Sequence, residues 1–260
     1  MTALTNQPAP APSSGATGIR IATAVVGGAI AVLAIGAAAI GQFGIAGATT
    51  TQSTEPIPAN VTSIDIANTI GDVSVFTTPG AQPSVEIRVD AFALNRMMAP
   101  QLQVDGDELS IEVPERTGPC FFACWGSVTI LVELGDRSLD ELDLSSDVGT
   151  VVVHEGVVVR DLTIESSVGD VMVLRPAATT IDVRSDVGSL RIEPDAATRE
   201  ITATTSVGDI DIRVQPGVDY DTWASSQIGD VVNDLASSTS ATQSISATSD
   251  IGNVRISVIR

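Results

Sequence analysis

A glycine with aliphatic residues at fixed distances recurs along the chain and limits what it can fold into. Val, Ile, Leu or Ala mostly occupies the positions seven, five and one before the glycine, and two and four after it. A Ser, Thr or Asn stands three before it. The glycines that carry this pattern are Gly71, Gly149, Gly169, Gly188, Gly208, Gly229 and Gly252. From Gly149 onward they lie about twenty residues apart, a period typical of repeat architectures.

Within each copy the apolar residues recur at every second position, which is the period of a β-strand. The glycine breaks this alternation, because residues one before and two after it are both apolar. One strand therefore ends there and another begins, and glycine tolerates the positive φ of such a corner. Stacked copies would align their aliphatic residues as columns in a continuous core. The sequence predicts an all-β, β-solenoid-like stack of short strands with repeats of about 20 residues.

Two departures from the pattern stand out. The copy around Gly229 is degraded, since Asn233 occupies its last apolar position. Between Gly71 and Gly149 the pattern is absent, and alternating segments at 85–89, 102–104, 109–113 and 128–134 predict half-buried strands instead. Asp105-Gly106 predicts a hairpin between the second and third of these. Gly71 is therefore expected to be a separated first copy.

The region before the repeats divides by composition. Residues 1–19 are rich in Pro, Ser and Gly and predict a disordered tail. Residues 20–48 hold an uncharged apolar run long enough for a transmembrane helix. The alternative is a signal peptide cleaved near Ala48, although the run exceeds the usual signal core. Residues 49–60 predict a linker, and 61–260 the repeat domain.

Flanking charges predict how the span is oriented. Arg20 precedes it, and no Lys or Arg follows until Arg88. The positive-inside rule then places the N-terminus in the cytoplasm and the large domain outside the cell. The anchor and the cleaved signal both export the domain, so they differ only in whether it stays attached to the membrane through residues 20–48.

The charge balance excludes some partners. The formal net charge is −19, and no lysine is present. Nucleic-acid binding requires cations that neutralise phosphates, so this chain is not expected to bind nucleic acid. The same argument opposes docking on anionic headgroups. Aromatic residues make up 3% of the chain, too few for a stacking platform.

The Val/Ile-Gly-Asp-Val/Ile repeats, behind a non-repeating strand block and a single apolar span, resemble the bacterial putative-adhesin or toastrack family, a domain of unknown function. The resemblance covers about Val61 to Arg260, including the seven glycines and the segment 128–134. It implies a cell-envelope protein with an interaction or sensing role and no catalytic chemistry. The segment from Cys120 to Trp125 does not match the family pattern.

That segment is the most unusual local sequence. Outside the cytoplasm neighbouring cysteines usually pair, so Cys120 and Cys124 are a disulfide candidate. Phe121, Phe122 and Trp125 form either a loop that caps one end of the stack or an exposed tip that contacts a partner. Two cysteines and one histidine supply too few ligands for a metal centre of the zinc type.

Other polar residues suggest no chemistry. His154 is the single histidine, and no neighbouring motif marks a nucleophile for it. One aspartate stands beside each corner glycine: Asp72, Asp147, Asp170, Asp186, Asp209, Asp230 and Asp250. Their spacing is not that of calcium-binding β-rolls, so they are expected to be solvated turn residues. No cofactor, metal site or catalytic residue is predicted.

The leading hypothesis is a non-catalytic, membrane-anchored cell-surface protein that acts in envelope interaction, adhesion or stress sensing. No polar segment follows the last repeat, so its strand predicts an open edge for a protein partner or self-association. Val258 is the expected contact there, and Trp223, in the degraded copy around Gly229, is a further candidate partner contact. The alternatives are a self-assembling polymer like the bactofilins and an extracellular carbohydrate-active enzyme.

Overall fold

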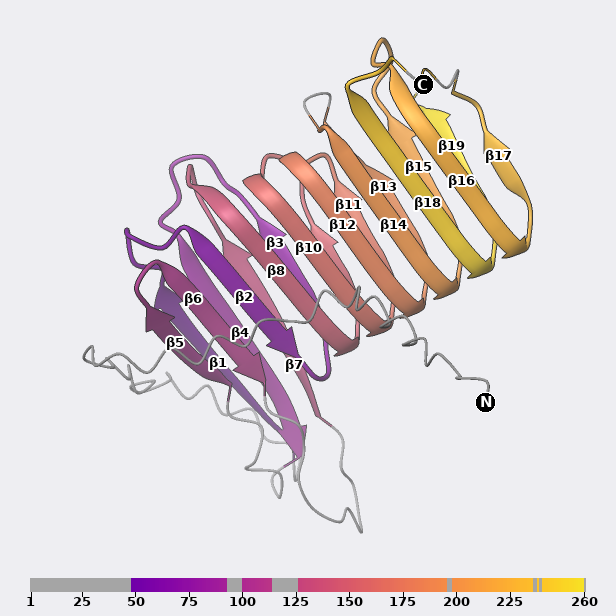
Figure 1. The fold of residues 1–260 in the computed structure, drawn as a ribbon. Coiled ribbons are helices and arrows are strands. Elements are labelled where there is room, and N and C mark those ends of the chain that lie inside the picture. Colours follow the sequence, from indigo (N-terminus) through magenta and orange to yellow (C-terminus); the bar gives the residue numbers. More distant parts are fainter. Residues whose placement is uncertain are drawn as a thin grey trace, which may run out of the picture. The chain divides into compact units, whose positions relative to one another are not determined.

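Parallel strands stacked in two facing sheets make up most of the fold (Figure 1). The structure, a computed structural model, describes residues 48–92, 100–113, 126–195, 198–235, 238 and 240–259. These residues form sheet A with ten strands and sheet B with nine. Within them, no helical segment has the length and apolarity that a membrane crossing demands. The expected tail and transmembrane helix, 1–19 and 20–48, lie outside the described residues except for Ala48.

The spatial order of the strands differs from their order in the chain. Sheet A runs β1 (Ala48–Pro56), β4 (Ser84–Phe92), β7 (Gly126–Glu133), β3 (Val73–Phe76), β9 (Val151–Val153), β11 (Val171–Leu174), β13 (Leu190–Glu193), β15 (Ile210–Val214), β19 (Val254–Val258) and β17 (Val231–Asn233). Sheet B runs β16 (Tyr220–Ile228), β18 (Gln243–Ile251), β14 (Glu200–Val207), β12 (Ala177–Val187), β10 (Val158–Val168), β8 (Ser138–Val148), β2 (Ser63–Asn68), β6 (Glu108–Val113) and β5 (Gln101–Asp105).

Each repeat forms one rung, which consists of a sheet B strand, a glycine corner and a sheet A strand. β10 and β11, joined at Gly169, are an example. Rungs pair in register, so that Leu162 of β10 lies beside Leu142 of β8 and Ile181 of β12. These three side chains are at most 1% exposed and belong to one core cluster that runs between the sheets. The predicted all-β stack of short strands is confirmed.

The first repeat is not separated from the others. The corner glycine Gly71 donates its backbone N–H to Val148 O at 2.8 Å, because β2 pairs with β8 and β3 with β9. The intervening segment instead extends the opposite side of this rung. There β6 pairs in parallel with β2 and β7 in parallel with β3, and β1, β4 and β5 add antiparallel strands.

The expected linker at 49–60 contains a strand. β1 pairs along its whole length with β4, from Ala48 opposite Phe92 to Pro56 opposite Ser84. The Thr-rich sequence suggested a linker because it lacks apolar alternation. Threonine nevertheless favours extended backbone, and an edge strand needs no buried face on both sides.

The last two repeats exchange places in the stack. The rung of Gly252 (β18 and β19) pairs directly with the rung of Gly208, and the rung of Gly229 (β16 and β17) lies beyond it. Figure 1 shows β17 and β16 at the end of the stack, outside β19 and β18. The expectation that the last strand forms the open edge is therefore wrong: β19 lies between β15 and β17. The degraded repeat is the terminal rung.

Candidate functional site: the terminal rung, its groove and the glycine corners

The terminal rung closes the core with polar side chains. Where inner rungs have buried aliphatic residues, this rung has Thr222 and Asn233, and Asn233 Nδ2 donates to Thr222 Oγ1 at 2.8 Å across the two sheets. Asn233 Oδ1 accepts the backbone N–H of Leu235, and Ser226 Oγ donates to Gly252 O at 2.7 Å. Terminal repeats of solenoids need such polar caps. The degraded pattern is therefore the sequence of a cap.

Large apolar side chains remain exposed on this capped rung. Trp223, on the outer face of edge strand β16, is 68% exposed, and Ile228 is 66% exposed. Val231 and Val232 of β17 are 43% and 41% exposed. Among the described residues, β16 pairs only with β18 and β17 only with β19, so each has one free edge. This end therefore offers an aromatic anchor beside two unpaired strand edges.

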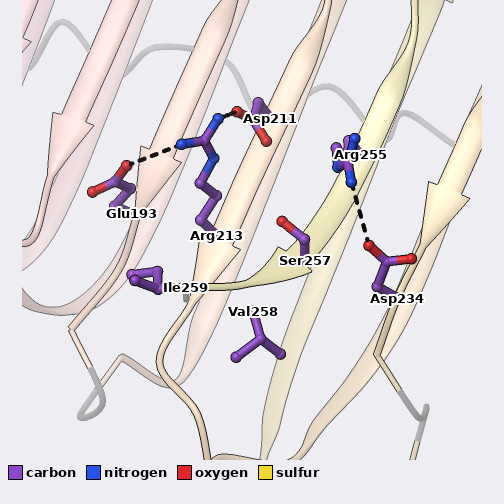
Figure 2. A pocket seen from close by; sticks show the side chains of 8 residues that line it. All are labelled: Glu193, Asp211, Arg213, Asp234, Arg255, Ser257, Val258 and Ile259. Atoms are coloured by element: carbon purple, nitrogen blue, oxygen red, sulfur yellow. Dashed lines mark ion pairs between the residues drawn. The ribbon is translucent and has the colours of Figure 1, made fainter.

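A groove of about 840 Å³ lies beside the terminal rung on sheet A. Its lining, shown in Figure 2, consists of Glu193, Asp211, Arg213, Asp234, Arg255, Ser257, Val258 and Ile259. β17 ends at Asn233, whereas β19 continues to Val258. The groove thus follows the place where the outermost strand is shorter than its neighbour. Val258, a predicted contact, lines it and is 39% exposed.

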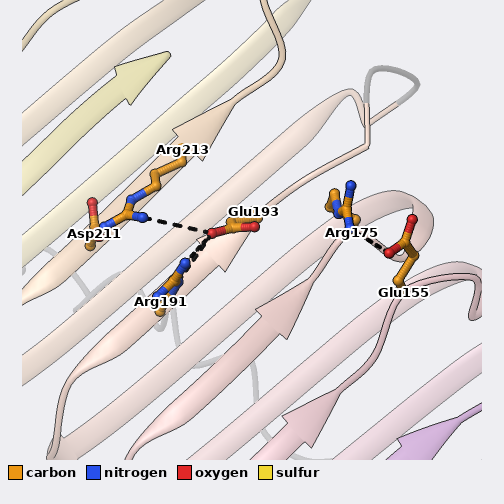
Figure 3. Close-up of polar contacts among 6 residues, drawn as sticks. All are labelled: Glu155, Arg175, Arg191, Glu193, Asp211 and Arg213. Atoms are coloured by element: carbon orange, nitrogen blue, oxygen red, sulfur yellow. Dashed lines mark hydrogen bonds and ion pairs between the residues drawn. The ribbon is translucent and has the colours of Figure 1, made fainter. Parts of the chain in front are cut away.

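Arginines and acids alternate across this part of sheet A. Arg213 contacts Asp211 at 2.5 Å and Glu193 at 4.0 Å, and Arg191 contacts Glu193 at 2.5 Å. Figure 3 shows these pairs together with a separate pair, Arg175 and Glu155. Exposed pairs contribute only about 0–1 kcal/mol each. Their main effect is on the local net charge. Because each arginine here lies beside a carboxylate, positive and negative charges nearly cancel on this part of sheet A.

Glycine is required at each corner for two physical reasons, as Gly169 illustrates. Its φ is +146°, a conformation that residues with a side chain rarely adopt. A Cβ there would also lie far inside van der Waals contact with Gly149 O of the neighbouring rung. The other corner glycines meet their neighbouring rungs in the same way. The seven glycines are therefore structural residues that allow the rungs to stack closely.

Three of the four aspartates that directly follow corner glycines tie neighbouring rungs together. Asp72 Oδ1 accepts the N–H of Thr150 at 2.9 Å, and Asp170 Oδ1 accepts the N–H of Ser189 at 2.9 Å. Asp209 Oδ1 accepts the N–H of Asn253 at 2.7 Å. These residues are exposed, as expected for turn residues, but each also satisfies a backbone donor of the next rung.

The aliphatic residue directly before each corner glycine was expected to join the core columns, and this is wrong for most rungs. Val148, Val168, Val187 and Val207 are 43–47% exposed. The residue three before the glycine is the last to point inward, and the chain bends between it and the corner. The bend turns the final aliphatic side chain outward, which alternation alone does not reveal.

Carboxylates crowd the outer face of sheet B near β2 and β8. Asp65 and Asp143 lie directly beside each other in the parallel pairing. Burial, followed by repulsion from Glu108, Glu112 and Glu141, raises the pKa of Asp65. Burial also raises the pKa of Asp143, with Asp65 adding to it, and the charge of Asp143 followed by burial raises the pKa of Glu141. These groups bind protons more tightly in the folded state than in the unfolded one.

This crowding predicts that the folded domain gains stability on mild acidification. A raised folded-state pKa means that stability falls as pH rises from the unfolded pKa, about 4, through the folded value. The Asp143→Asn variant removes one repelling charge. We expect it to melt at a higher temperature than wild type at about pH 7.5, and its advantage to shrink as the pH falls to about 5.

Differential scanning calorimetry across this pH range provides the measurement. Asp182→Asn is the matched control, because Asp182 lies in the same outward row two strands away but contacts Arg184 at 2.9 Å. Removing the charge of Asp182 abolishes its attraction to Arg184 and is not expected to raise the melting temperature. A lower melting temperature for Asp143→Asn at about pH 7.5 contradicts the repulsion argument.

His154 has a partner that the sequence did not mark. Its Nε2 lies 3.0 Å from Ser74 Oγ of the neighbouring strand β3, and its ring packs edge-on against Phe76 with centroids 6.4 Å apart. The contact joins residues 80 positions apart in the chain, so spacing gave no signal for it. Among the described residues, no group of three or more His, Cys, Asp or Glu is arranged to hold a metal ion.

The predicted contacts are brought together only in part. Trp223 and Val258 both lie in the last two rungs of the stack. Cys120, Cys124, Phe121, Phe122 and Trp125 lie outside the described residues. Ile228, Val231 and Val232, which are also exposed at this end, were not among the predicted contacts. Their signal was available in Asn233, because a polar residue in a core column marks a rung with no neighbour on one side.

This chain is similar to several solved structures. No curated protein matches the chain. A solved structure of a putative cell adhesion protein from Clostridium sporogenes is similar at 10% identity, with 81% of this chain and 100% of that chain covered and a TM-score of 0.47. A putative adhesin from Bacteroides fragilis is similar at 15% identity, with 81% and 97% covered and a TM-score of 0.38.

Family membership rests on the sequence model. The model described as Toastrack DUF4097 matches residues 61–260, which is most of the chain. The matched range begins just before β2 and contains all seven glycine corners and both strands of the terminal rung. The chain therefore belongs to the Toastrack DUF4097 family.

Proposed function

We propose that this protein is a non-catalytic, membrane-anchored cell-surface interaction protein whose terminal rung binds a protein partner. Residues 20–48 hold it in the membrane, with the N-terminus in the cytoplasm and the stack outside. Two solved structures similar to this chain are described as a putative cell adhesion protein and a putative adhesin, which supports an adhesion-like role. The apolar run behind Arg20 supports the anchor.

The observation that carries this proposal is the exposure of Trp223 on a rung that is otherwise capped. A stack end with an unfinished core would expose aliphatic residues of the core columns. Here Asn233 and Thr222 close most of the core, while Trp223 points away from it at 68% exposure. Tryptophan is enriched at interaction hot spots because it combines a large apolar surface with a polar N–H. The free edge of β16 adds backbone groups that pair with an extended segment.

Site-specific cross-linking in the native envelope tests the partner site. A photo-reactive amino acid replaces Trp223 in one variant and Thr204 in a control, because Thr204 is also exposed on the outer face of sheet B but lies in an inner rung. We expect a discrete cross-linked partner from position 223 and none from position 204. Equal products from both positions, or none from either, would contradict a terminal-rung site.

Fractionation tests the anchor separately. The full-length chain is expected in the membrane fraction, and a chain lacking residues 1–47 behind a cleavable export signal is expected in the soluble fraction. A mature N-terminus near Ala48 together with release from cells would replace the anchor by the cleaved signal. That result would not affect the proposed terminal-rung site, which the cross-linking experiment tests separately.

A second candidate function is end-to-end self-assembly into a polymer. It is favoured by the strand edges that no other described strand covers at both ends of each sheet, β17 and β1 in sheet A and β16 and β5 in sheet B. The Asn233–Thr222 cap opposes it, because joining two ends would bury these polar groups. Because of this cap, we expect the sedimentation coefficient of the isolated domain not to change with its concentration. Filaments seen by electron microscopy would instead favour the polymer.

A further inference from the structure

The glycine corners carry an exposed apolar strip along the stack. The residues directly before six corner glycines lie on consecutive rungs and form one column, here called the corner ridge. In spatial order they are Val148, Val168, Val187, Val207, Ile251 and Ile228, and they are 43–66% exposed. Single exposed aliphatic residues are normal on a protein surface, whereas a contiguous strip marks an interaction site.

Folding of the stack does not explain the ridge. These side chains are turned away from the core, so burial does not require them. Their β-branched shape favours extended backbone, but threonine satisfies that preference equally. Threonine fills neighbouring outward positions of sheet B, such as Thr163, Thr202 and Thr204, and never a ridge position in these six rungs. A strictly aliphatic column on the surface is therefore a feature that stacking leaves unexplained.

Aspartates border the ridge in a regular zigzag. Each of the six ridge rungs, and the adjoining rung of Gly71, has one Asp either directly after the glycine or two residues before it, and the two positions alternate from rung to rung. In spatial order they are Asp72, Asp147, Asp170, Asp186, Asp209, Asp250 and Asp230. No Arg occupies these positions. The exchange of the last two rungs preserves the alternation, because chain order would place Asp209 and Asp230 on the same side in succession.

The alternation fixes two repeat distances. Neighbouring strands lie about 4.8 Å apart, so ridge residues repeat at about 4.8 Å and the acids on each side at about 9.6 Å. Like charges on adjacent strands repel, and alternation keeps same-side acids two rungs apart. The surface is thus an aliphatic line with negative charges staggered along both sides.

These distances fit an α-helix better than a strand. In a helix with heptad repeats, the apolar residues at positions a and d follow one another about every 5.2 Å along the helix axis. The e positions on one side of these residues, and the g positions on the other, each repeat about every 10.5 Å. A strand laid along the ridge would advance about 6.6 Å between same-face residues. Over the five intervals of the ridge the helix accumulates a mismatch of about 2 Å, and the strand about 9 Å.

We propose that the corner ridge docks an amphipathic α-helix whose aliphatic seam is flanked on both sides by Lys or Arg. The seam covers the ridge, and the basic side chains meet the staggered aspartates. A helix of about 16 residues spans the ridge from Val148 to Ile228. This site is independent of the terminal-rung partner, because its central residues lie in inner rungs.

Synthetic peptides test the chemistry of the helix. The probe is a fluorescently labelled peptide of three heptads with Leu at a and d and Lys at e and g, and its binding is followed by anisotropy at about 0.15 M salt. We expect saturable binding that weakens at least tenfold when Glu replaces Lys, or when Ser replaces Leu. A strand-forming peptide of alternating Leu and Lys is expected to bind more weakly, and tighter binding of it would overturn the helix assignment.

Matched variants of the domain test the site. Val168→Thr, Val187→Thr and Val207→Thr are combined in one variant that keeps β-branched residues and all aspartates. The control combines Val152→Thr and Val158→Thr, two outward-facing valines that lie outside both the ridge and the terminal rung. We expect the ridge variant to bind the probe at least tenfold more weakly and the control to bind as wild type does. Equal binding by both variants would mean that acidity alone attracts the peptide, and the proposal would fail.

Discussion

The Gly169→Ala variant is expected to lose more than about 3 kcal/mol of folding free energy, enough to unfold much of the domain at ambient temperature. Two penalties add. The backbone at φ +146° is a region that only glycine occupies readily, which costs about 1–3 kcal/mol. The new methyl group also collides with Gly149 O, so the neighbouring rungs must separate.

Gly217→Ala separates these two penalties. Gly217 also has positive φ, +84°, but a Cβ there meets no atom within 4 Å. We expect it to cost about 1–2 kcal/mol, the usual penalty of a left-handed residue. Urea unfolding of both variants gives the comparison. Similar losses would show that backbone conformation alone requires glycine at the corners, and would contradict the role of close rung contact.

The Val254→Ala variant is expected to destabilise the domain by about 2 kcal/mol, and Val231→Ala by less than about 0.5 kcal/mol. Both valines occupy the position two after a corner glycine, and they pair with each other between β19 and β17. Val254 is fully buried between neighbouring rungs, whereas Val231 is 43% exposed at the stack end. The residue type and the pattern position are identical, so the difference reports burial.

This pair tests the exchange of the last two rungs. If the rungs stacked in chain order, Val254 would lie at the end and Val231 inside, and the two losses would be reversed. Melting temperatures are a sufficient readout, since about 1 kcal/mol shifts the midpoint by about 2–4 °C in a domain of this size. A larger shift for Val231→Ala than for Val254→Ala would contradict the spatial order.

The repeating rungs were predictable from the sequence, because the residues within one copy determine the conformation of that copy. The alternation at Leu162 and Ile164 and the glycine at Gly169 determine a strand, a corner and another strand without reference to the rest of the chain. Stacking then follows, since one rung cannot bury its own apolar face. The hairpin at Asp105-Gly106 was predicted for the same reason, because a tight turn depends on its own residues.

The arrangement of the rungs was not predictable from the repeat. The copies at Gly229 and Gly252 follow the same pattern, so either can stack on Gly208, and the period contains no information on adjacency. Asn233 held the missing signal, because its polarity suits only a rung with one neighbour. Strand β1 was missed because its partner β4 is distant in the chain, with Pro56 opposite Ser84 and Ala48 opposite Phe92, and because the pairing needs no apolar pattern.

The candidate site was predictable only where it breaks the rule of the repeat. Trp223 was singled out because it lies in the degraded copy around Gly229. The corner ridge was not identified, because residues such as Val187 have the composition of a core and their outward position depends on the bend before the glycine. The Ser74–His154 contact forms because their two rungs are neighbours in the stack, and the spacing of the two residues in the sequence does not predict it.

The exchange of the last two rungs also makes the domain sensitive to whether synthesis has finished. The outermost rung is made before the rung that it rests on, so β16 and β17 have no partner strands until β18 and β19 exist. A chain truncated before Gly252 is therefore not a shorter stack. It leaves β14 and β15 as an open apolar end and the cap residues with nothing to cover. The cap closes only on a chain that extends through Val258, so the order of the rungs acts as a check on completeness.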